Sequence, residues 1–358
     1  TILTSPHIMQ EEKDYWIDGI YLGGHNAVWA WQSAIIRKSE KGKIYVTDTT
    51  GQWWFPIAGH YSAEMSEGCI NANLNALDTP GEWHIQDGKL YVWMPKSDNP
   101  QSHIVEAKRR QLAFDLSDKK NIYINDIDIF SASITMARAE NCTFDRCLAS
   151  YTSHYLLFTD ARNGFIEKGE RTVENSPQTG EVGIYISGLN NKFINGTIRY
   201  SAGAGIILAG YGTVIENNII HDVGYANTYL GGIFANDEFG NVGNKSNIKV
   251  GNYKIRYNTI YNIGRSAINI GAIENNIAQY AGSDISYNQM FNTMLFTSDG
   301  GAFYAYGVNL GADGKRTELH HNLFWNCFRK SGKGVIYSDN LVEGLDIHSN
   351  TLWSHEYS

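Results

Sequence analysis

An asparagine recurs in one sequence context through the second half of the chain, and this repeat constrains the fold more than any other feature. An aliphatic residue stands three positions before it and an apolar residue two positions after it, in copies at Asn218, Asn258, Asn288, Asn322 and Asn350. The intervals are 40, 30, 34 and 28 residues. Such a period is typical of stacked supersecondary units rather than of one globular core. We expect the amides to form a ladder, each bonding to the coils above and below.

A second repeat accompanies the first from about residue 183 onward. Each coil carries a short apolar run that opens on glycine, or once on alanine, at 183–187, 205–209, 232–236, 267–270, 301–305 and 334–338. Two or three short strands per coil, stacked in register, form a parallel β-helix, and the crossover rule favours the right-handed form. No coil has a helical period, which excludes leucine-rich and helical repeats. We predict an all-β fold, a right-handed parallel β-helix with a small N-terminal antiparallel β-module.

The two parts are expected to meet near residue 110. Residues from about 14 to 105 alternate in polarity without the repeat, so 1–110 is predicted to be a β-rich module and 111–358 the solenoid. The early coils are expected to fill the ladder position with Asp126, Cys147 and Gly196. Insertions at 158–182, 221–230, 239–252 and 307–317 mark the functional side of such a stack.

Composition narrows the class of partner. The formal net charge is -8 and no basic cluster exceeds residues 108–110, so nucleic-acid binding is not expected. Aromatic residues make up 13% of the chain, which suits a surface that stacks on sugar rings. No segment is long and apolar enough to cross a membrane. The chain begins without methionine or a signal peptide and stops just after a ladder position, so we expect further sequence beyond both ends.

Two segments resemble motifs of bacterial carbohydrate-active β-helix enzymes. Residues 297–307 (TSDGGAFYAYG) resemble their D-G-G-[AG]-[IF]-Y-x-x-G segment, and residues 334–340 (GVIYSDN) resemble their G-[IV]-Y-x-D-[DN] segment. In order and spacing they are similar to family 141 glycoside hydrolases, in which two aspartates at comparable positions are the proposed catalytic pair. The resemblance implies a glycoside hydrolase with Asp299 and Asp339 as catalytic residues, a polysaccharide or oligosaccharide substrate, and a secreted or periplasmic location.

The spacing of the two aspartates sets a geometric condition. Hydrolysis of a glycosidic bond needs two carboxyl groups on either side of the bond. If Tyr304 pairs with Tyr337, Asp299 lies five residues before that level and Asp339 two residues after it. Seven residues of straight strand span roughly 23 Å, which is too far. The pair therefore requires a turn that folds Asp299 back over the strand, and Gly300-Gly301 permits one.

Further residues are assigned to substrate binding. If Tyr304 pairs with Tyr337, one level of successive coils contains Asp237, Gly271, Tyr306 and Asp339. Asp237 would then lie about 14 Å from Asp339. This separation suits two residues on opposite walls of a groove. The predicted substrate-binding residues are Asp237, Glu238, Tyr306, Tyr304, His221 and Arg265. No cofactor is predicted. Calcium is the one metal left open, because Asp237-Glu238 is a compact acidic pair. Strand alternation turns His320 and His321 to opposite faces, which argues against zinc.

Two other functions stay open from the residues alone. A polysaccharide lyase would need a base and a group that neutralises a uronate carboxylate. The candidates for these roles are Tyr185, Lys168, Arg171, Arg199, Tyr200, His221 and Arg265. A non-catalytic glycan-binding or adhesive β-helix is the third reading. An unsaturated product would favour the lyase, whereas binding without cleavage would favour the adhesive protein.

Overall fold

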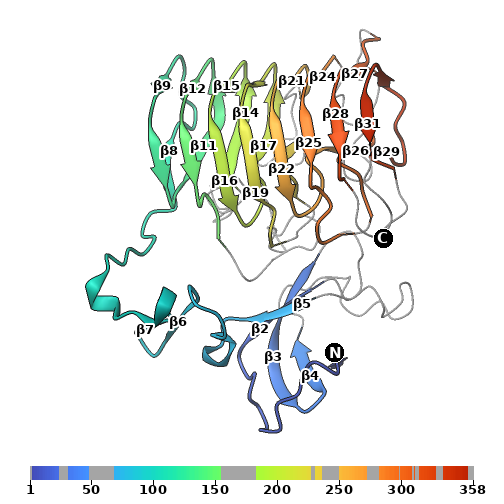
Figure 1. The fold of residues 1–358 in the computed structure, drawn as a ribbon. Helices are drawn as coiled ribbons and strands as arrows, with labels where there is room; N and C mark the ends of the chain where they lie inside the picture. The colour runs from blue at the N-terminus through green and yellow to red at the C-terminus, as the bar shows by residue number, and fades with distance from the viewer. Residues whose placement is uncertain are drawn as a thin grey trace. The chain divides into compact units, whose positions relative to one another are not determined.

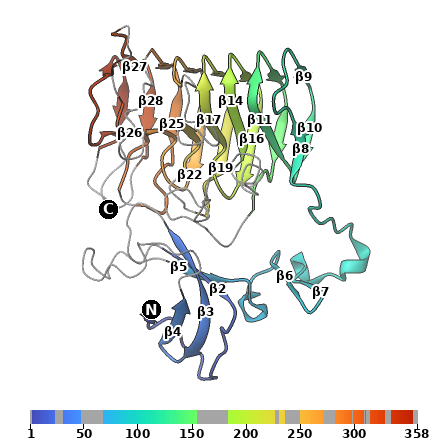
Figure 2. The same cartoon turned by 180° about the vertical axis from the view of Figure 1, so that it is seen from behind.

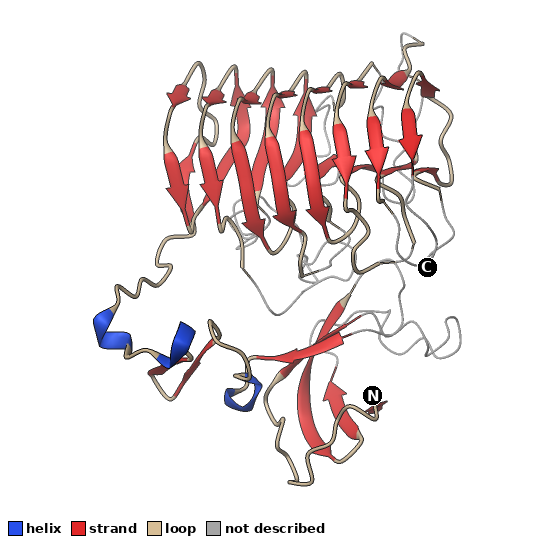
Figure 3. Cartoon of the chain, viewed as in Figure 1, coloured by secondary structure: helices blue, strands red, loops and turns tan. Residues whose placement is uncertain are grey.

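The structure is a computed structural model of the 358-residue chain. It describes residues 2–23, 31–47, 68–154, 183–226, 230–235, 250–271, 282–297, 299–308, 310, 314–327 and 334–353. Strands are the main regular secondary structure of the described residues, and the helices among them are short 3-10 turns (Figure 3). The chain divides into two compact units, with the change between Arg109 and Arg110. The two units are described separately.

The N-terminal unit contains a five-stranded antiparallel sheet. In spatial order its strands are β1 (Ile2–Thr4), β4 (Lys43–Thr47), β3 (Gln32–Glu40), β2 (Ile20–Gly23) and β5 (Gly68–Asn71). Leu3, Ala34, Ile36, Ile44 and Val46 form its buried core. A separate hairpin joins β6 (Trp83–Gln86) to β7 (Lys89–Val92), and three short 3-10 helices flank it: η2 (Leu74–Ala76), η3 (Pro95–Ser97) and η4 (Pro100–Ser102).

The second unit is built from three parallel sheets of eight strands each. Sheet 1 consists of β8 (Leu112–Asp115), β11 (Ser133–Glu140), β14 (Ile184–Leu189), β17 (Ile206–Tyr211), β20 (Ile233–Ala235), β23 (Ile268–Gly271), β26 (Phe303–Tyr306) and β29 (Ile336–Ser338). Sheet 2 consists of β9 (Tyr123–Asn125), β12 (Thr143–Asp145), β15 (Lys192–Ile194), β18 (Val214–Glu216), β21 (Lys254–Arg256), β24 (Asp284–Ser286), β27 (Thr317–His320) and β30 (Leu345–His348). Sheet 3 consists of β10 (Asp128–Phe130), β13 (Leu148–Ser150), β16 (Thr197–Ser201), β19 (Ile219–Val223), β22 (Thr259–Ile263), β25 (Gln289–Phe291), β28 (Leu323–Trp325) and β31 (Thr351–Trp353).

The chain visits the three sheets in the same order in every coil. Each strand pairs with the strand three places further along the chain, so neighbouring coils lie side by side from β8 to β31 (Figures 1 and 2). One hydrophobic core runs through all the coils, filled by the inward residues of each sheet, such as Ile268, Ile285 and Ile260. The alternate residues face outward, because side chains of a strand alternate between its two faces.

The asparagine ladder predicted from the sequence is present and buried. The Oδ1 of Asn258 accepts hydrogen bonds from the backbone N and the Nδ2 of Asn218, both at 3.0 Å. The Nδ2 of Asn258 donates to Ile215 O at 2.9 Å and to Asn288 Oδ1 at 2.9 Å. The same pattern continues to Asn350. From Asn218 to Asn322, each amide thus bonds to both neighbouring coils, and both its oxygen and its nitrogen are paired.

A left-handed residue precedes the ladder position in every coil. Its φ is +59° at Asp126, +52° at Arg146 and +55° at Asn217. Asp126 was predicted to fill the ladder position itself, and that prediction is wrong by one residue. In the register of the paired strands, Ile127 lies opposite Cys147. The backbone carbonyl of Ile127 accepts a hydrogen bond from the next coil, as the backbone carbonyl of Asn218 does. The turn conformation, rather than the residue type, defines the position.

Candidate functional site

The residues of interest lie where the chain passes from sheet 3 to sheet 1, and on the outward face of sheet 1. Arg265 follows β22, and Asp299 follows β25 one coil later. Tyr304 lies on β26, and Asp339 directly follows β29. Since Tyr304 pairs with Tyr337, as expected, Tyr306 comes opposite Asp339. Four of the residues selected from the sequence are joined here by direct contacts.

The first contact joins Tyr304 to Asp339. The Tyr304 hydroxyl donates to Asp339 Oδ2 at 2.7 Å, and the backbone N of Asn340 donates to Asp339 Oδ1 at 2.8 Å. Tyr304 is buried and Asp339 is half-buried. Both carboxylate oxygens are therefore held by donors from two neighbouring coils, and the carboxylate has a fixed orientation.

Arg265 connects this pair to Asp299. Its guanidinium carbon lies 4.6 Å from the centre of the Tyr304 ring, within the range of a cation–π contact. Its Nη2 donates to the backbone carbonyl of Asp299 at 3.3 Å. Arg265 is only 1% exposed, so its charge is shielded from solvent by the surrounding protein. The arginine acts as a bridge between two coils.

The turn required for Asp299 is formed at Gly300. The φ of Gly300 is +156°, a backbone conformation that L side chains rarely adopt, so glycine is favoured here. The turn brings the Asp299 carbonyl to Arg265, which itself lies over Tyr304. The Oδ1 of Asp299 is buried and has no hydrogen-bond partner among the residues that the structure describes. A buried carboxyl oxygen without a donor is unusual in a folded protein and calls for an explanation.

Sequence reasoning missed Asn269, which lies beside Tyr304 in register on the adjacent strand β23. It is fully buried, and neither its Nδ2 nor its Oδ1 has a hydrogen-bond partner in the described part of the chain. The preceding coils carry Ile207 and Phe234 at this level. The available signal in the sequence was one amide side chain at a level where the two preceding coils carry apolar residues.

His221 lies elsewhere, on the outward face of sheet 3. Its ring stacks on Tyr261 at a centroid distance of 4.9 Å, and its Nδ1 is 2.6 Å from Asp222 Oδ2. The stack continues through Phe291, Trp325 and Trp353. No described contact joins His221 to Tyr304 or Asp339, so its role in substrate binding stays a prediction.

Three other assignments have different outcomes. Tyr306 is half-buried, and it pairs with Gly271 on one side. Asp237 and Glu238 lie outside the described residues, and so do Lys168 and Arg171. Calcium binding at Asp237-Glu238, which the sequence left open, therefore falls outside the described residues. Within the described ranges, no group of three or more His, Cys, Asp or Glu side chains is arranged to hold a metal ion.

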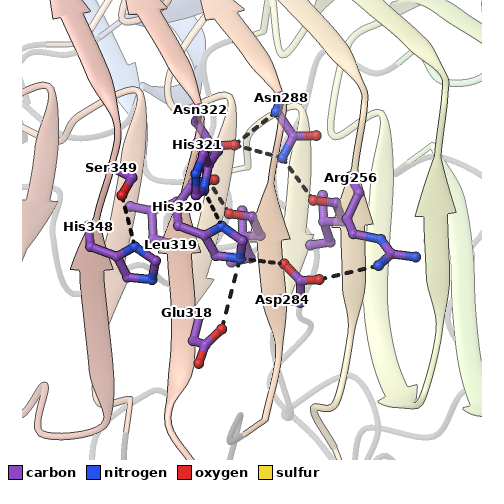
Figure 4. A network of polar contacts seen from close by, with 12 residues as sticks. Arg256, Asp284, Asn288, Glu318, Leu319, His320, His321, Asn322, His348 and Ser349 are labelled. Carbon is purple, nitrogen blue, oxygen red and sulfur yellow. Dashed lines mark hydrogen bonds and ion pairs between the residues drawn. The ribbon is translucent and has the colours of Figure 1, made fainter.

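The prediction that His320 and His321 face opposite sides is wrong. His321 has a φ of +55° and follows the last residue of β27, so strand alternation no longer applies. The two Nδ1 atoms lie 2.7 Å apart (Figure 4). The ring of His320 stacks on that of His348 at 5.0 Å with an angle of 4°, a parallel arrangement that does not converge on one ion. The histidines on sheet 2 thus belong to a network of polar contacts.

Ion pairs extend the network across sheet 2. His320 Nε2 lies 3.2 Å from Asp284 Oδ1, and Arg256 Nη1 lies 3.4 Å from Asp284 Oδ2 (Figure 4). Arg256 also pairs with Glu216 one coil earlier, and hydrogen bonding to this carboxylate raises the pKa of Arg256. These side chains are part-exposed, and each contact joins neighbouring coils. We interpret the network as lateral support for the stack.

Comparison with known proteins gives one informative result. No protein-family model matches the chain, and no curated protein sequence matches it. A solved structure described as "Glycoside hydrolase" is similar, with a TM-score of 0.55 at 12% sequence identity. The similarity covers 99% of this chain and 70% of that one. At this identity the likeness establishes a shared all-β fold. Among the described residues, no helix is long and apolar enough to span a membrane.

Proposed function

We propose that the chain is a carbohydrate-active enzyme that hydrolyses glycosidic bonds of a polysaccharide or oligosaccharide. The observation that carries the proposal is the contact series from Asp299 through Arg265 and Tyr304 to Asp339. It links the Asp339 carboxylate to the backbone of Asp299 in the preceding coil, and hydrolysis uses two carboxyl groups at one glycosidic bond. The fold shared with a structure described as a glycoside hydrolase supports the same function.

The two aspartates are suited to different roles. Asp339 accepts hydrogen bonds at both oxygens and is held in one orientation, as a nucleophile or a water-activating base must be. Asp299 has an oxygen without a donor, which suits the acid that gives its proton to the leaving oxygen. Arg265 and Tyr304 connect the Asp299 backbone to the Asp339 carboxylate, and the proposed reaction needs no metal ion for either step.

The lyase alternative has weaker support. Burial raises the pKa of Tyr185 to about 12 and leaves it 1% exposed, so it is a poor base for substrate. Arg265 is equally buried and is engaged with Tyr304 and Asp299, so a uronate carboxylate would not reach it. The adhesive alternative has no feature in its favour that the hydrolase lacks.

The proposal also covers the type of β-fold, the hydrolase family, the cellular location and calcium binding. We infer that the three-sheet stack is a right-handed parallel β-helix, supported by its strictly repeated order of parallel strands. The two motifs around Asp299 and Asp339 favour a family 141 type of hydrolase. A polysaccharide substrate favours secretion or a periplasmic location. Calcium at Asp237-Glu238 would serve stability, and EDTA treatment with thermal unfolding tests this.

The hydrolase proposal is tested with Asp299→Asn and Asp339→Asn. Release of reducing ends is measured on a panel of neutral and acidic polysaccharides, together with ultraviolet absorbance from unsaturated uronates. We expect each variant to lose at least about 10²-fold in kcat. Asp346→Asn, an exposed aspartate on β30, is the matched control and should retain activity. Unsaturated products would overturn hydrolysis, and full activity in both variants would overturn the catalytic pair.

A further inference from the structure

A second row of turn residues runs along the stack at the ends of the sheet 3 strands. Each lies three residues after the first residue of its strand and has a left-handed φ, between +49° and +58°. In chain order the row consists of Ser131, Tyr151, Tyr200, Asp222, Asn262, Asn292 and Asn326. Asparagine tolerates this backbone conformation well, and the three asparagines form a ladder in which each Nδ2 donates to the preceding coil. The ladder ends at Asp222 Oδ1, which accepts from Asn262 at 3.0 Å.

In the two coils before Asp222 the same row is aromatic. The rings of Tyr200 and Tyr151 stack with their centroids 4.9 Å apart, and the ring of Phe130 on β10 lies 5.3 Å from that of Tyr151. Phe130 is 66% exposed and Tyr151 is 46% exposed. A left-handed φ is uncommon for a bulky residue, so the turn itself does not explain these tyrosines. Adjacent exposed aromatic rings are typical of a binding surface.

Arg199 adds a positive charge beside these rings. It lies half-buried on the outward face of β16, with its guanidinium carbon 5.4 Å from the centre of the Tyr200 ring. Its Nε donates to Ser150 Oγ at 2.9 Å. No carboxylate oxygen of the described residues lies within 4.0 Å of this guanidinium, whereas Arg256 on sheet 2 pairs with Glu216. The Nη1 and Nη2 groups of Arg199 are therefore available to a ligand.

The acidic residue near Arg199 in this row is already engaged. Arg199 lies opposite His221 on β19, and these two strands lie side by side in Figure 1. Asp222 Oδ2 is 2.6 Å from His221 Nδ1, while Asp222 Oδ1 accepts from Asn262. The guanidinium of an arginine offers paired N–H donors that match the oxygens of a carboxylate or sulfate group. A formal net charge of -8 disfavours a nucleic acid as the source of such an anion.

We propose that Phe130, Tyr151, Tyr200 and Arg199 form a binding surface for an acidic glycan, whose sugar rings bear carboxylate or sulfate groups. The Nη groups of Arg199 bind the anionic group, and the exposed aromatic rings contact the apolar C–H face of a sugar. This surface lies on sheet 3 in early coils, whereas the proposed catalytic pair lies beside sheet 1 in later ones. It holds a polymer to the protein and does not depend on hydrolysis.

The test measures binding in an Asp339→Asn background, in which the proposed cleavage is blocked. Arg199→Met removes the charge and keeps the apolar stem, while Tyr151→Asn removes an exposed ring and keeps a residue that suits the turn. Tyr257→Asn is the control for the ring, because Tyr257 is 55% exposed with a φ of +59° but follows sheet 2. Lys192→Met, at an exposed position on β15, is the control for the charge.

Isothermal titration calorimetry is performed with oligouronates, sulfated oligosaccharides, neutral oligosaccharides and a single-stranded oligonucleotide. Thermal unfolding is measured for every variant, so that a loss of binding is separated from a loss of folding.

We expect Arg199→Met to weaken binding of acidic oligosaccharides by about tenfold or more and to abolish their advantage over neutral ones. Tyr151→Asn should weaken the same ligands by about threefold or more. Added salt should weaken binding to the background protein, since the contact with Arg199 is ionic. Both control variants should bind as the background protein does. Binding of oligouronates alone identifies a carboxylate as the anionic group, and binding of sulfated oligosaccharides alone identifies a sulfate.

Each contrary result has a separate meaning. Unchanged binding of acidic oligosaccharides in Arg199→Met, or in Tyr151→Asn if the first variant does not fold, overturns the inference and leaves hydrolysis intact. Equal losses in the control variants, a preference for neutral oligosaccharides, or tighter binding of the oligonucleotide also overturn it. Arg199-dependent binding without cleavage of any polymer by wild type upholds the binding surface and overturns the hydrolase proposal instead.

Discussion

The Tyr304 hydroxyl ties one proposed catalytic carboxylate to the neighbouring coil. Tyr304→Phe removes its 2.7 Å hydrogen bond to Asp339 and keeps the ring under Arg265. A hydrogen bond to a charged group contributes roughly 1.5–3 kcal/mol, so we expect kcat/KM to fall by about 10- to 150-fold. Steady-state kinetics on the cleaved glycan measure this. The fold should remain intact, because the ring stays packed.

Tyr287→Phe is the matched control for that substitution. Tyr287 is 47% exposed and stacks on Tyr257 at 5.2 Å, and it follows sheet 2, away from the site. Its variant should retain wild-type kinetics. An equal loss in both variants would mean that the effect is general, and no loss in Tyr304→Phe would remove Tyr304 from the mechanism.

Asp145 supports the early coils through its charge. It is buried, and Asn195 Nδ2 donates to it at 2.8 Å while the Tyr123 hydroxyl donates to its other oxygen. These two hydrogen bonds hold the pKa of Asp145 below its usual value. A lowered pKa in the folded state means that the stabilisation is present above the unfolded pKa of about 3.9 and is lost as the pH falls through the folded pKa.

Asp145→Asn should therefore lower the free energy of unfolding by roughly 1.5–3 kcal/mol at neutral pH. The difference from wild type should shrink as the pH falls below about 4, because Asp145 then takes up a proton first in the unfolded state and, at lower pH, in the folded state too. Urea unfolding across a pH series measures it. Asp128→Asn, an exposed residue on β10, should change stability by less than about 0.5 kcal/mol. A constant difference at all pH values would contradict the charge-based account.

At the level of strands and turns, the ladder offers an internal comparison. Asn258→Ala leaves the N and Nδ2 of Asn218 and the carbonyl of Ile215 without partners in a dry interior. We expect a loss of about 3–5 kcal/mol. Asn350 makes equivalent hydrogen bonds to Asn322 and Leu319, but it is only part-buried. In Asn350→Ala, water can replace the lost hydrogen bonds, so the free energy of unfolding should fall by only about 1 kcal/mol. Equal losses in urea unfolding would show that burial is not the cause.

The repeat elements were predictable because their determinants are local and recur. The same backbone turn precedes the ladder position in every coil, so the asparagines show which residues of neighbouring coils are aligned. The site is different, because its geometry depends on contacts between coils. The bend at Gly300 lies beside the side chains of Met294 and Arg265, and no periodic pattern marks these neighbours. His321 was misplaced for a related reason: the strand ends one residue earlier than the alternation suggests.

At the level of the whole molecule, the two units have separate hydrophobic cores. Ile36 belongs to a small cluster of five buried residues in the N-terminal unit. Ile260 belongs to the continuous core of the three-sheet stack, and the clusters share no residue. Cores that share no residues unfold independently unless an interface couples them. Calorimetry of the full chain should therefore resolve two transitions.

Two core variants assign those transitions. Ile36→Ala and Ile260→Ala each delete buried methyl groups from a fully buried position, at an expected cost of about 2–5 kcal/mol. Ile36→Ala should lower only the transition with the smaller enthalpy, since enthalpy of unfolding scales with the number of residues that unfold. Ile260→Ala should lower only the larger one. A single transition whose temperature both variants lower equally would mean that the two units unfold as one cooperative body. The boundary near residue 110 would then separate two structural units that do not unfold independently.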